Sequence, residues 1–71
     1  MVDMQKVTST NVDAVGYDAG ARELHIRYLN SSDLYVYLDV PSEVFKTLLK
    51  ARSIGAFVNS DIKPRYRFMK R

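Results

Sequence analysis

Hydrophobic and polar residues alternate along much of the first half of the chain, which is typical of β-strands in a half-buried sheet. The alternation is clearest in residues 22–29, where Leu24, Ile26 and Tyr28 share one parity. Charged residues occupy the other parity together with His25, so we expect this histidine at the surface. A β-strand with one apolar face is therefore predicted here.

Two further strands are expected on either side of this one. Residues 11–18 alternate imperfectly, and Gly16 within them indicates a bulge or a close approach of another backbone segment. Residues 34–39 form the other strand. Turn-forming residues at 18–21, including a glycine suited to positive φ, and at 30–33 separate the three segments. The pattern predicts two antiparallel hairpins.

A helical period replaces the alternation after Pro41, a residue that suits the first turn of a helix. Val44 and Leu48 lie one helical turn apart on the predicted apolar stripe. Ser53 is a candidate N-cap for a second, short helix over residues 54–62. The predicted hydrophobic core combines the helical stripe with the apolar face of the clearest strand: Leu24, Ile26, Val44, Leu48 and Leu49.

The order of these elements is β-β-β-α-α, followed by residues 65–68, whose alternating basic and aromatic side chains fit a terminal strand or an extended tail. We therefore predict a single small α+β domain, with a three- to four-stranded antiparallel sheet and helices packed on one face. Residues 1–10 are expected to form an N-terminal lead-in, and residues 11–71 the domain itself.

A length of 71 residues allows one domain with a small core and excludes a two-domain enzyme with a cleft between lobes. The absence of Cys and the single His exclude a Cys-rich zinc finger, a disulfide framework and a thiol nucleophile. We predict no catalytic residues, metal site or cofactor, and no small-molecule substrate is evident. The longest apolar run, residues 34–38, is too short to cross a membrane, and no secretory signal is visible. A cytoplasmic location is expected.

Charge is distributed unevenly along the chain. Eight of the 11 Lys and Arg residues lie in residues 46–71, whereas seven of the 8 acidic residues lie in residues 1–45. A basic segment of this kind favours a polyanionic partner, nucleic acid before an anionic membrane. Residues 63–71 interleave cations with Tyr66 and Phe68, so cations can bind phosphates while a ring stacks on a base. The same segment also fits a terminal strand with its aromatic side chains in the core.

Tyr35 and Tyr37 project from one face of their predicted strand, roughly 7 Å apart, a spacing that suits two splayed nucleobases. A two-residue turn at residues 31–32 would instead pair Tyr35 with Tyr28 and place the rings on the apolar face. A one-residue change in the loop would move both tyrosines to the face of His25. The packed arrangement is favoured, although the sequence leaves the register open.

Several short segments follow one another in a characteristic order and spacing: Val7-Thr8-Ser9, Val12-Asp13-Ala14-Val15-Gly16-Tyr17-Asp18, Leu24-His25-Ile26-Arg27-Tyr28, Tyr35-Val36-Tyr37, Val40-Pro41 and Ala51-Arg52-Ser53-Ile54-Gly55-Ala56-Phe57-Val58-Asn59. Together they resemble the KTSC domain family, which occurs at the C-terminus of some lysyl-tRNA synthetases and as free-standing small bacterial and phage proteins. The resemblance covers nearly the whole chain, from about Val7 to Phe68.

The resemblance also implies which single residues match the family's pattern. The central Tyr-x-Tyr maps onto Tyr35 and Tyr37. The family's Asn, its Ile-Arg and a later Tyr map onto Asn59, Ile62, Lys63 and Tyr66, with Lys where Arg is usual. The glycine usual in the second hairpin is replaced by residues 30–33, which again leaves the tyrosine register open. The family implies an RNA-binding role and no catalytic residues.

The combined interpretation is a non-catalytic domain that binds RNA, or another nucleic acid, through a basic C-terminal surface. The alternative is a protein-interaction module of bacterial or phage origin that docks on an acidic protein surface. No membrane partner is expected. The predicted nucleic-acid-binding residues are Lys50, Arg52, Lys63, Arg65, Tyr66, Arg67, Lys70 and Arg71, together with Tyr35 and Tyr37.

Overall fold

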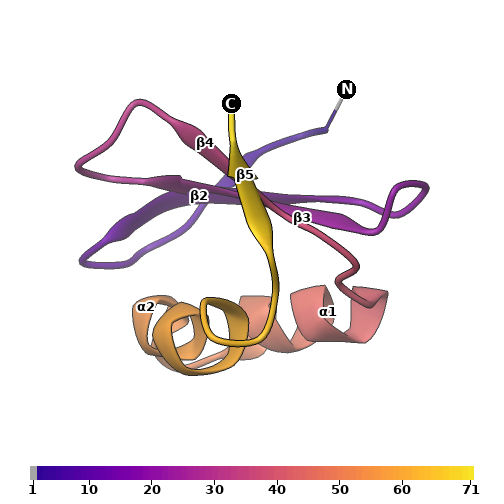
Figure 1. The fold of residues 1–71 in the computed structure, drawn as a ribbon. Helices are drawn as coiled ribbons and strands as arrows, with labels where there is room; N and C mark the ends of the chain where they lie inside the picture. Colours follow the sequence, from indigo (N-terminus) through magenta and orange to yellow (C-terminus); the bar gives the residue numbers. More distant parts are fainter. Residues whose placement is uncertain (1) are drawn as a thin grey trace.

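A computed structural model describes residues 2–71 as a five-stranded antiparallel sheet with helices beneath one face (Figure 1). The elements are β1 (Gln5–Lys6), β2 (Val12–Asp18), β3 (Glu23–Tyr28), β4 (Leu34–Tyr37), α1 (Ser42–Lys50), α2 (Ile54–Phe57), η1 (Val58–Ile62) and β5 (Phe68–Lys70). The strands lie in the sheet in chain order. The predicted α+β class and the helices on one face are confirmed, and the short strand β1 adds an edge that the pattern did not indicate.

The hairpin between β3 and β4 decides where the tyrosines lie. Ile26 pairs with Tyr35 and Leu24 pairs with Tyr37, and the five residues 29–33 connect the two strands. The pairing of Tyr35 with Tyr28 was therefore wrong by two residues. Because a shift of two keeps the parity, both tyrosines still project from the face of Leu24 and Ile26, and the packed arrangement is confirmed.

The core lies between this face and the helices. Leu24, Ile26 and Leu48 are fully buried, as predicted, and Val44 packs against them while partly exposed. Leu49 is 40% exposed, so its place in the predicted core was wrong. The nine-residue helix α1 touches the sheet along one narrow stripe, and the residue after Leu48 is rotated about 100° away from it.

The second helical segment runs from residue 54 to residue 62, as predicted. The side chain of Ser53 accepts a hydrogen bond from the Ala56 N–H at 3.2 Å and caps the start. The segment widens in η1, where the N–H of Lys63 donates to the carbonyl of Val58 at 2.9 Å. Val58 and Ile62, one turn apart, are fully buried and complete the core.

The last strand is real but lies further along the chain than residues 65–68. The residues between η1 and β5 carry the chain from the helical layer up to the edge of the sheet (Figure 1). Pairing then begins where the carbonyl of Arg67 accepts the N–H of Leu38 at 2.8 Å. In β5, Phe68 pairs with Tyr37 and Lys70 pairs with Tyr35. Strand register therefore places Phe68 and Lys70 on the same face as the tyrosines.

Both described ends of the chain lie on the side of the sheet away from the helices (Figure 1). A Cβ at Gly16 would lie 2.7 Å from Val2 Cγ1 and 2.8 Å from the Asp3 carbonyl oxygen. This confirms the predicted close approach, while the bulge falls between Val12 and Ala14. Within residues 2–71, no helix has both the length and the apolar character to cross a membrane.

Two further expectations were wrong, one about His25 in β3 and one about the turn between β2 and β3. His25 is only 6% exposed rather than at the surface, because the face opposite the helices is itself partly covered. In the turn after β2, Asp18 Oδ1 accepts the N–H of Ala21 at 3.1 Å, as turn chemistry predicts. The positive φ, however, belongs to Arg22 at 57°, and no glycine has one.

Candidate nucleic-acid interface

Aromatic rings gather where β3, β4 and β5 meet, on the helix-facing side of the sheet. The rings of Tyr28 and Tyr35 meet edge to face with centroids 5.1 Å apart. Phe68 lies on the adjacent strand β5, with its ring centroid 5.3 Å from that of Tyr35 and 5.7 Å from that of Tyr37. Register explains the grouping, since alternate residues of adjacent strands project from one face.

The rings differ in what they offer to a partner. Tyr37 is 2% exposed and its hydroxyl lies 2.8 Å from that of Tyr28, so it belongs to the core. Its inclusion among the binding residues is therefore corrected, because a buried ring has no free face for a base. Tyr35 is partly buried, and Phe68 is 50% exposed. These two rings present aromatic surface to solvent.

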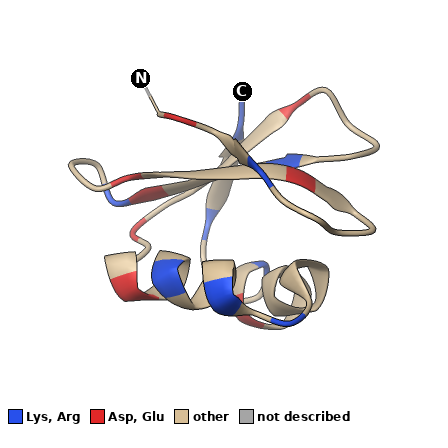
Figure 2. Ribbon diagram, turned by 180° about the vertical axis from the view of Figure 1, so that it is seen from behind, with Lys and Arg blue, Asp and Glu red and all other residues tan. Residues whose placement is uncertain are grey.

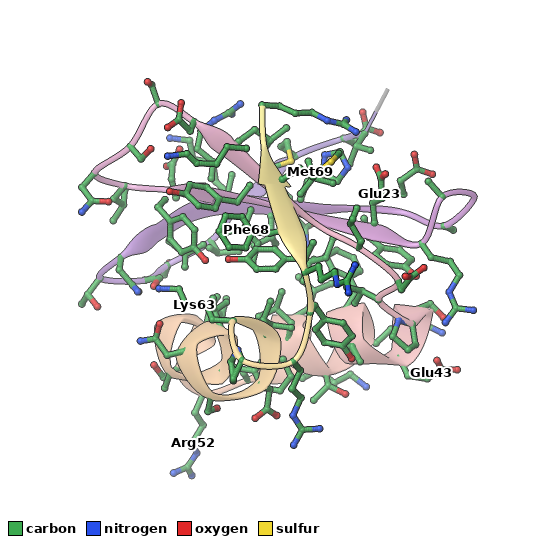
Figure 3. The ribbon with its side chains drawn as sticks, in the orientation of Figure 1. Glu23, Glu43, Arg52, Lys63, Phe68 and Met69 are labelled. Carbon is green, nitrogen blue, oxygen red and sulfur yellow. The ribbon has the colours of Figure 1, made fainter. Side chains whose placement is uncertain are left out.

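Two lysines approach this group from different elements. Lys63, just after η1, places Nζ 5.1 Å from the ring centroid of Tyr28. Lys70, in β5, places Nζ 5.7 Å from the centroid of Tyr35. Figure 3 shows Lys63 at the end of the helical layer, on the side of the sheet where Phe68 lies. We call Tyr28, Tyr35, Phe68, Lys63 and Lys70 the β5-edge cluster.

Burial fixes the protonation of the two inner phenols. Removal from water raises the pKa of Tyr28 above its ordinary value, and the hydrogen bond to Tyr37 raises it further. Burial also raises the pKa of the Tyr37 hydroxyl. Both hydroxyls therefore stay neutral at physiological pH, and the lysines carry the charge of the cluster.

Arg65, Tyr66 and Arg67 lie beside the cluster in the chain, between η1 and β5. Together with Leu38 and Asp39 they line a shallow hollow of about 370 Å³. The two arginines are exposed and Tyr66 is partly buried against the core. This segment can add positive charge next to the β5-edge cluster.

The remaining predicted cations do not gather at this edge. Lys50 ends α1, and Arg52 points away from the sheet below the helical layer (Figure 3). Arg71 lies on the opposite face of the sheet, where Nη2 is 3.8 Å from Glu23 Oε2. Figure 2 shows Lys and Arg spread over both the helices and the sheet, with Asp and Glu between them. The basic third of the sequence is thus divided among three surfaces.

The predicted binding residues include Tyr35, Lys63 and Lys70 of the cluster but neither Tyr28 nor Phe68, which the sequence offered only as a ring that stacks on a base or packs in the core. Tyr28 lies on the apolar parity of β3, where the pattern indicates only a core residue. Its proximity to Lys63 depends on how the helical segment ends beneath the hairpin, which no local pattern encodes. No group of His, Cys, Asp or Glu side chains within residues 2–71 is arranged to hold a metal ion. Cations over aromatic rings are suited to binding phosphates and stacking on bases.

Comparison with known proteins identifies close relatives. The KTSC domain family matches residues 8–66. A protein from Tsukamurella paurometabola is 45% identical over 64 residues, which is 90% of this chain and 94% of that protein. A protein from Stutzerimonas stutzeri is 36% identical over 58 residues, 82% of this chain and 80% of its own length. The crystal structure of a KTSC domain protein from Yersinia pestis superposes with a TM-score of 0.95 at 30% identity, covering 100% of this chain and 99% of that one.

Proposed function

The chain belongs to the KTSC domain family, and we propose that it is a non-catalytic RNA-binding domain that acts in the cytoplasm. The proposed contact surface for single-stranded RNA is the exposed part of the β5-edge cluster, formed by Phe68, Tyr35 and the two lysines, while the buried Tyr28 holds Lys63 in place. Arg65 and Arg67, next to the cluster in the chain, extend the positive charge along the same strand connection.

The observation that carries this proposal is the half-exposed ring of Phe68 beside Tyr35, the ring that Lys70 approaches. A purely structural phenylalanine is usually buried, yet Phe68 is 50% exposed while it contacts Tyr35 and Tyr37 with one side. The free side of the ring can stack on a base, a contact that tolerates any sequence. Lys70 approaches the ring of Tyr35 and Lys63 that of Tyr28, so both can bind phosphates of the nucleotides that follow the stacked base.

The lysines are free to change partners. Lys70 Nζ lies 3.7 Å from Asp33 Oδ2, and both side chains are about half exposed, at 55% and 48%. Such a surface ion pair contributes little and is easily replaced by a phosphate. Within residues 2–71, Lys63 has no ion-pair partner, only the ring of Tyr28. Neither charge has to be removed from a strong interaction before RNA binds.

The test compares two substitutions in the same strand by fluorescence anisotropy of labelled single-stranded RNA at low salt. Phe68→Leu removes the ring but keeps an apolar side chain, and loss of one stacked base should weaken binding roughly five- to a hundredfold. Met69→Leu is the matched control, because Met69 is 45% exposed but pairs with Val36 on the other face. Equal affinity of the two variants, or no binding by the parent protein at low salt, would contradict the proposal.

A further inference from the structure

The sheet face opposite the helices carries polar side chains that RNA binding at the β5 edge does not use. Arg27 on β3 lies opposite Leu34 on β4. Leu34 in turn exchanges two backbone hydrogen bonds with Arg71, with N···O distances of 3.0 and 2.8 Å. Arg27, Leu34 and Arg71 therefore form one row across three strands. His25 lies in the next row, opposite Val36.

Glu23 and His25 form a pair on this face, because side chains two residues apart on a strand project from the same side. His25 Nε2 lies 3.2 Å from Glu23 Oε1. A carboxylate only accepts hydrogen bonds, so Nε2 carries the proton and donates it. The side chains are 7% and 19% exposed, which shows that the pair is held within the face rather than solvated above it.

Arg71 joins the two rows. Its guanidinium Nη2 lies 3.8 Å from Glu23 Oε2, although its backbone is paired with Leu34 in the row of Arg27. The long side chain therefore crosses the face above the sheet. Each oxygen of the Glu23 carboxylate has one cationic or donor partner, His25 or Arg71.

The N-terminal residues form a wall beside these groups. Residues 2–4 pass directly over Gly16, where a Cβ would lie 2.9 Å from Met4 Sδ. Val2 and Met4 then line a cavity of about 440 Å³ whose polar walls include His25 and Arg27. The cavity is thus bounded by apolar side chains on one side and by charged groups on the sheet.

Two guanidinium groups face this cavity, and one of them is uncommitted. Asp18 also lines the cavity, but its Oδ1 accepts the Ala21 N–H, and Glu23 is paired as described. Within residues 2–71, Arg27 has no ion-pair partner, although it is partly buried. A guanidinium presents a planar fork of donors that matches the oxygens of a carboxylate or phosphate. An oxyanion is the chemistry that would satisfy it.

We propose that this cavity binds a small molecule that carries a carboxylate or phosphate group. Arg27 and Arg71 bind the oxyanion, and Glu23 holds Arg71 and His25 in position. The second ring nitrogen of His25, Nδ1, has no hydrogen bond within residues 2–71 and is not fully enclosed. Nδ1 is thus available for a hydrogen bond to a polar group of the same ligand. This site is separate from the β5-edge cluster and does not depend on RNA binding.

The test is an NMR titration of the nitrogen-15-labelled protein with inorganic phosphate and, separately, with acetate, each at constant ionic strength set with sodium chloride. We expect saturable shifts of the amides of residues 23–27 and of Arg71. The anion that saturates at the lower concentration identifies the preferred group. Absence of saturable shifts with both anions would overturn the proposal.

Two variants locate the site. Arg27→Gln removes one charge-assisted contact and should weaken anion binding about tenfold, with an otherwise unchanged amide spectrum. Arg52→Gln removes a cation from the far side of the helical layer and should leave the affinity unchanged. Arg27→Lys keeps the charge without the fork, so an intermediate loss is expected, and it replaces the Gln variant if that one fails to fold. Equal effects at positions 27 and 52 would show that the anions bind only by net charge.

Discussion

The two faces of the sheet are both buried near their centres, but different structures cover them. On one face Leu24 and Ile26 meet the helices, and Val58 and Ile62 complete an apolar core. On the other face His25 is 6% exposed, covered without any helix by neighbouring side chains and by residues 2–4. The comparison shows that burial on a sheet does not by itself mean hydrophobic packing. The face that packs against the helices, which we call the covered face, holds the fold together. The opposite face, which no helix covers and which we call the open face, holds charged groups in fixed positions.

The largest expected effect contrasts two adjacent residues of α1. Leu48 is fully buried under the covered face, so Leu48→Ala should lower the free energy of unfolding by about 2–5 kcal/mol. Leu49→Ala is the matched control, because Leu49 is 40% exposed and should cost only about 0.5 kcal/mol. Urea unfolding of both variants measures the difference. Similar midpoints would mean that α1 does not pack as described.

The covered face should also respond to alkaline pH through Tyr28 and Tyr37. Both pKa values are raised above 10.0 in the fold, so the unfolded chain loses these protons first. Stability from these groups is therefore complete well below pH 10.0 and is lost as the pH rises above it.

The double variant Tyr28→Phe/Tyr37→Phe provides the control for this pH dependence. It removes both partners of the hydroxyl–hydroxyl contact and so leaves no buried group unpaired. Its free energy of unfolding should fall less steeply between pH 10 and 11 than that of the parent, as urea titrations at several pH values would measure. Parallel pH profiles would show that these phenols ionise as freely in the fold as in the unfolded chain.

Alternation and helical period were sufficient to predict much of the covered face. They identified Leu24, Ile26 and Leu48 and the cap at Ser53, and they favoured the observed face for Tyr35 and Tyr37 without fixing the register. These features depend on residues close together in the chain, where local geometry fixes which side chains share a face.

The features that the sequence did not predict depend on contacts between distant segments. His25 is buried because the N-terminal residues and Arg71 reach over β3 from opposite ends of the chain. Tyr28 joins the β5-edge cluster because Lys63 approaches it from the end of the helical layer. Leu49 was assigned to the core because the apolar stripe was read as wider than the contact that α1 makes. In each of these cases the burial or the neighbours of the residue depend on tertiary packing rather than on the local sequence pattern.

A substitution at Gly16 tests what covers the open face. Gly16→Ala places a methyl group 2.8 Å from the Asp3 carbonyl oxygen, so residues 2–4 must move away from the sheet. We expect a loss of about 1–2 kcal/mol in the free energy of unfolding and faster amide hydrogen exchange in β1. Gly20→Ala is the control, since its Cβ would lie 3.5 Å from Asp18 Oδ1 and the glycine φ is not positive. Unchanged exchange in β1 for Gly16→Ala would mean that residues 2–4 do not rest on the sheet.

The smallest expected effect is a change in the salt dependence of RNA binding, which should differ between a lysine of the β5-edge cluster and a lysine on the outer surface of α1. If Lys63 neutralises an RNA phosphate, then Lys63→Gln should flatten the plot of log K against log[salt] by about 0.7, the contribution of one released counterion on a single strand. Lys46→Gln removes the same charge from the exposed side of α1 and should leave the slope unchanged. Because both variants lower the net charge by the same amount, their slopes differ only if RNA contacts Lys63 and not Lys46. Salt titrations of labelled single-stranded RNA measure both slopes, and equal slopes would indicate that RNA responds to total charge rather than to this edge of the sheet.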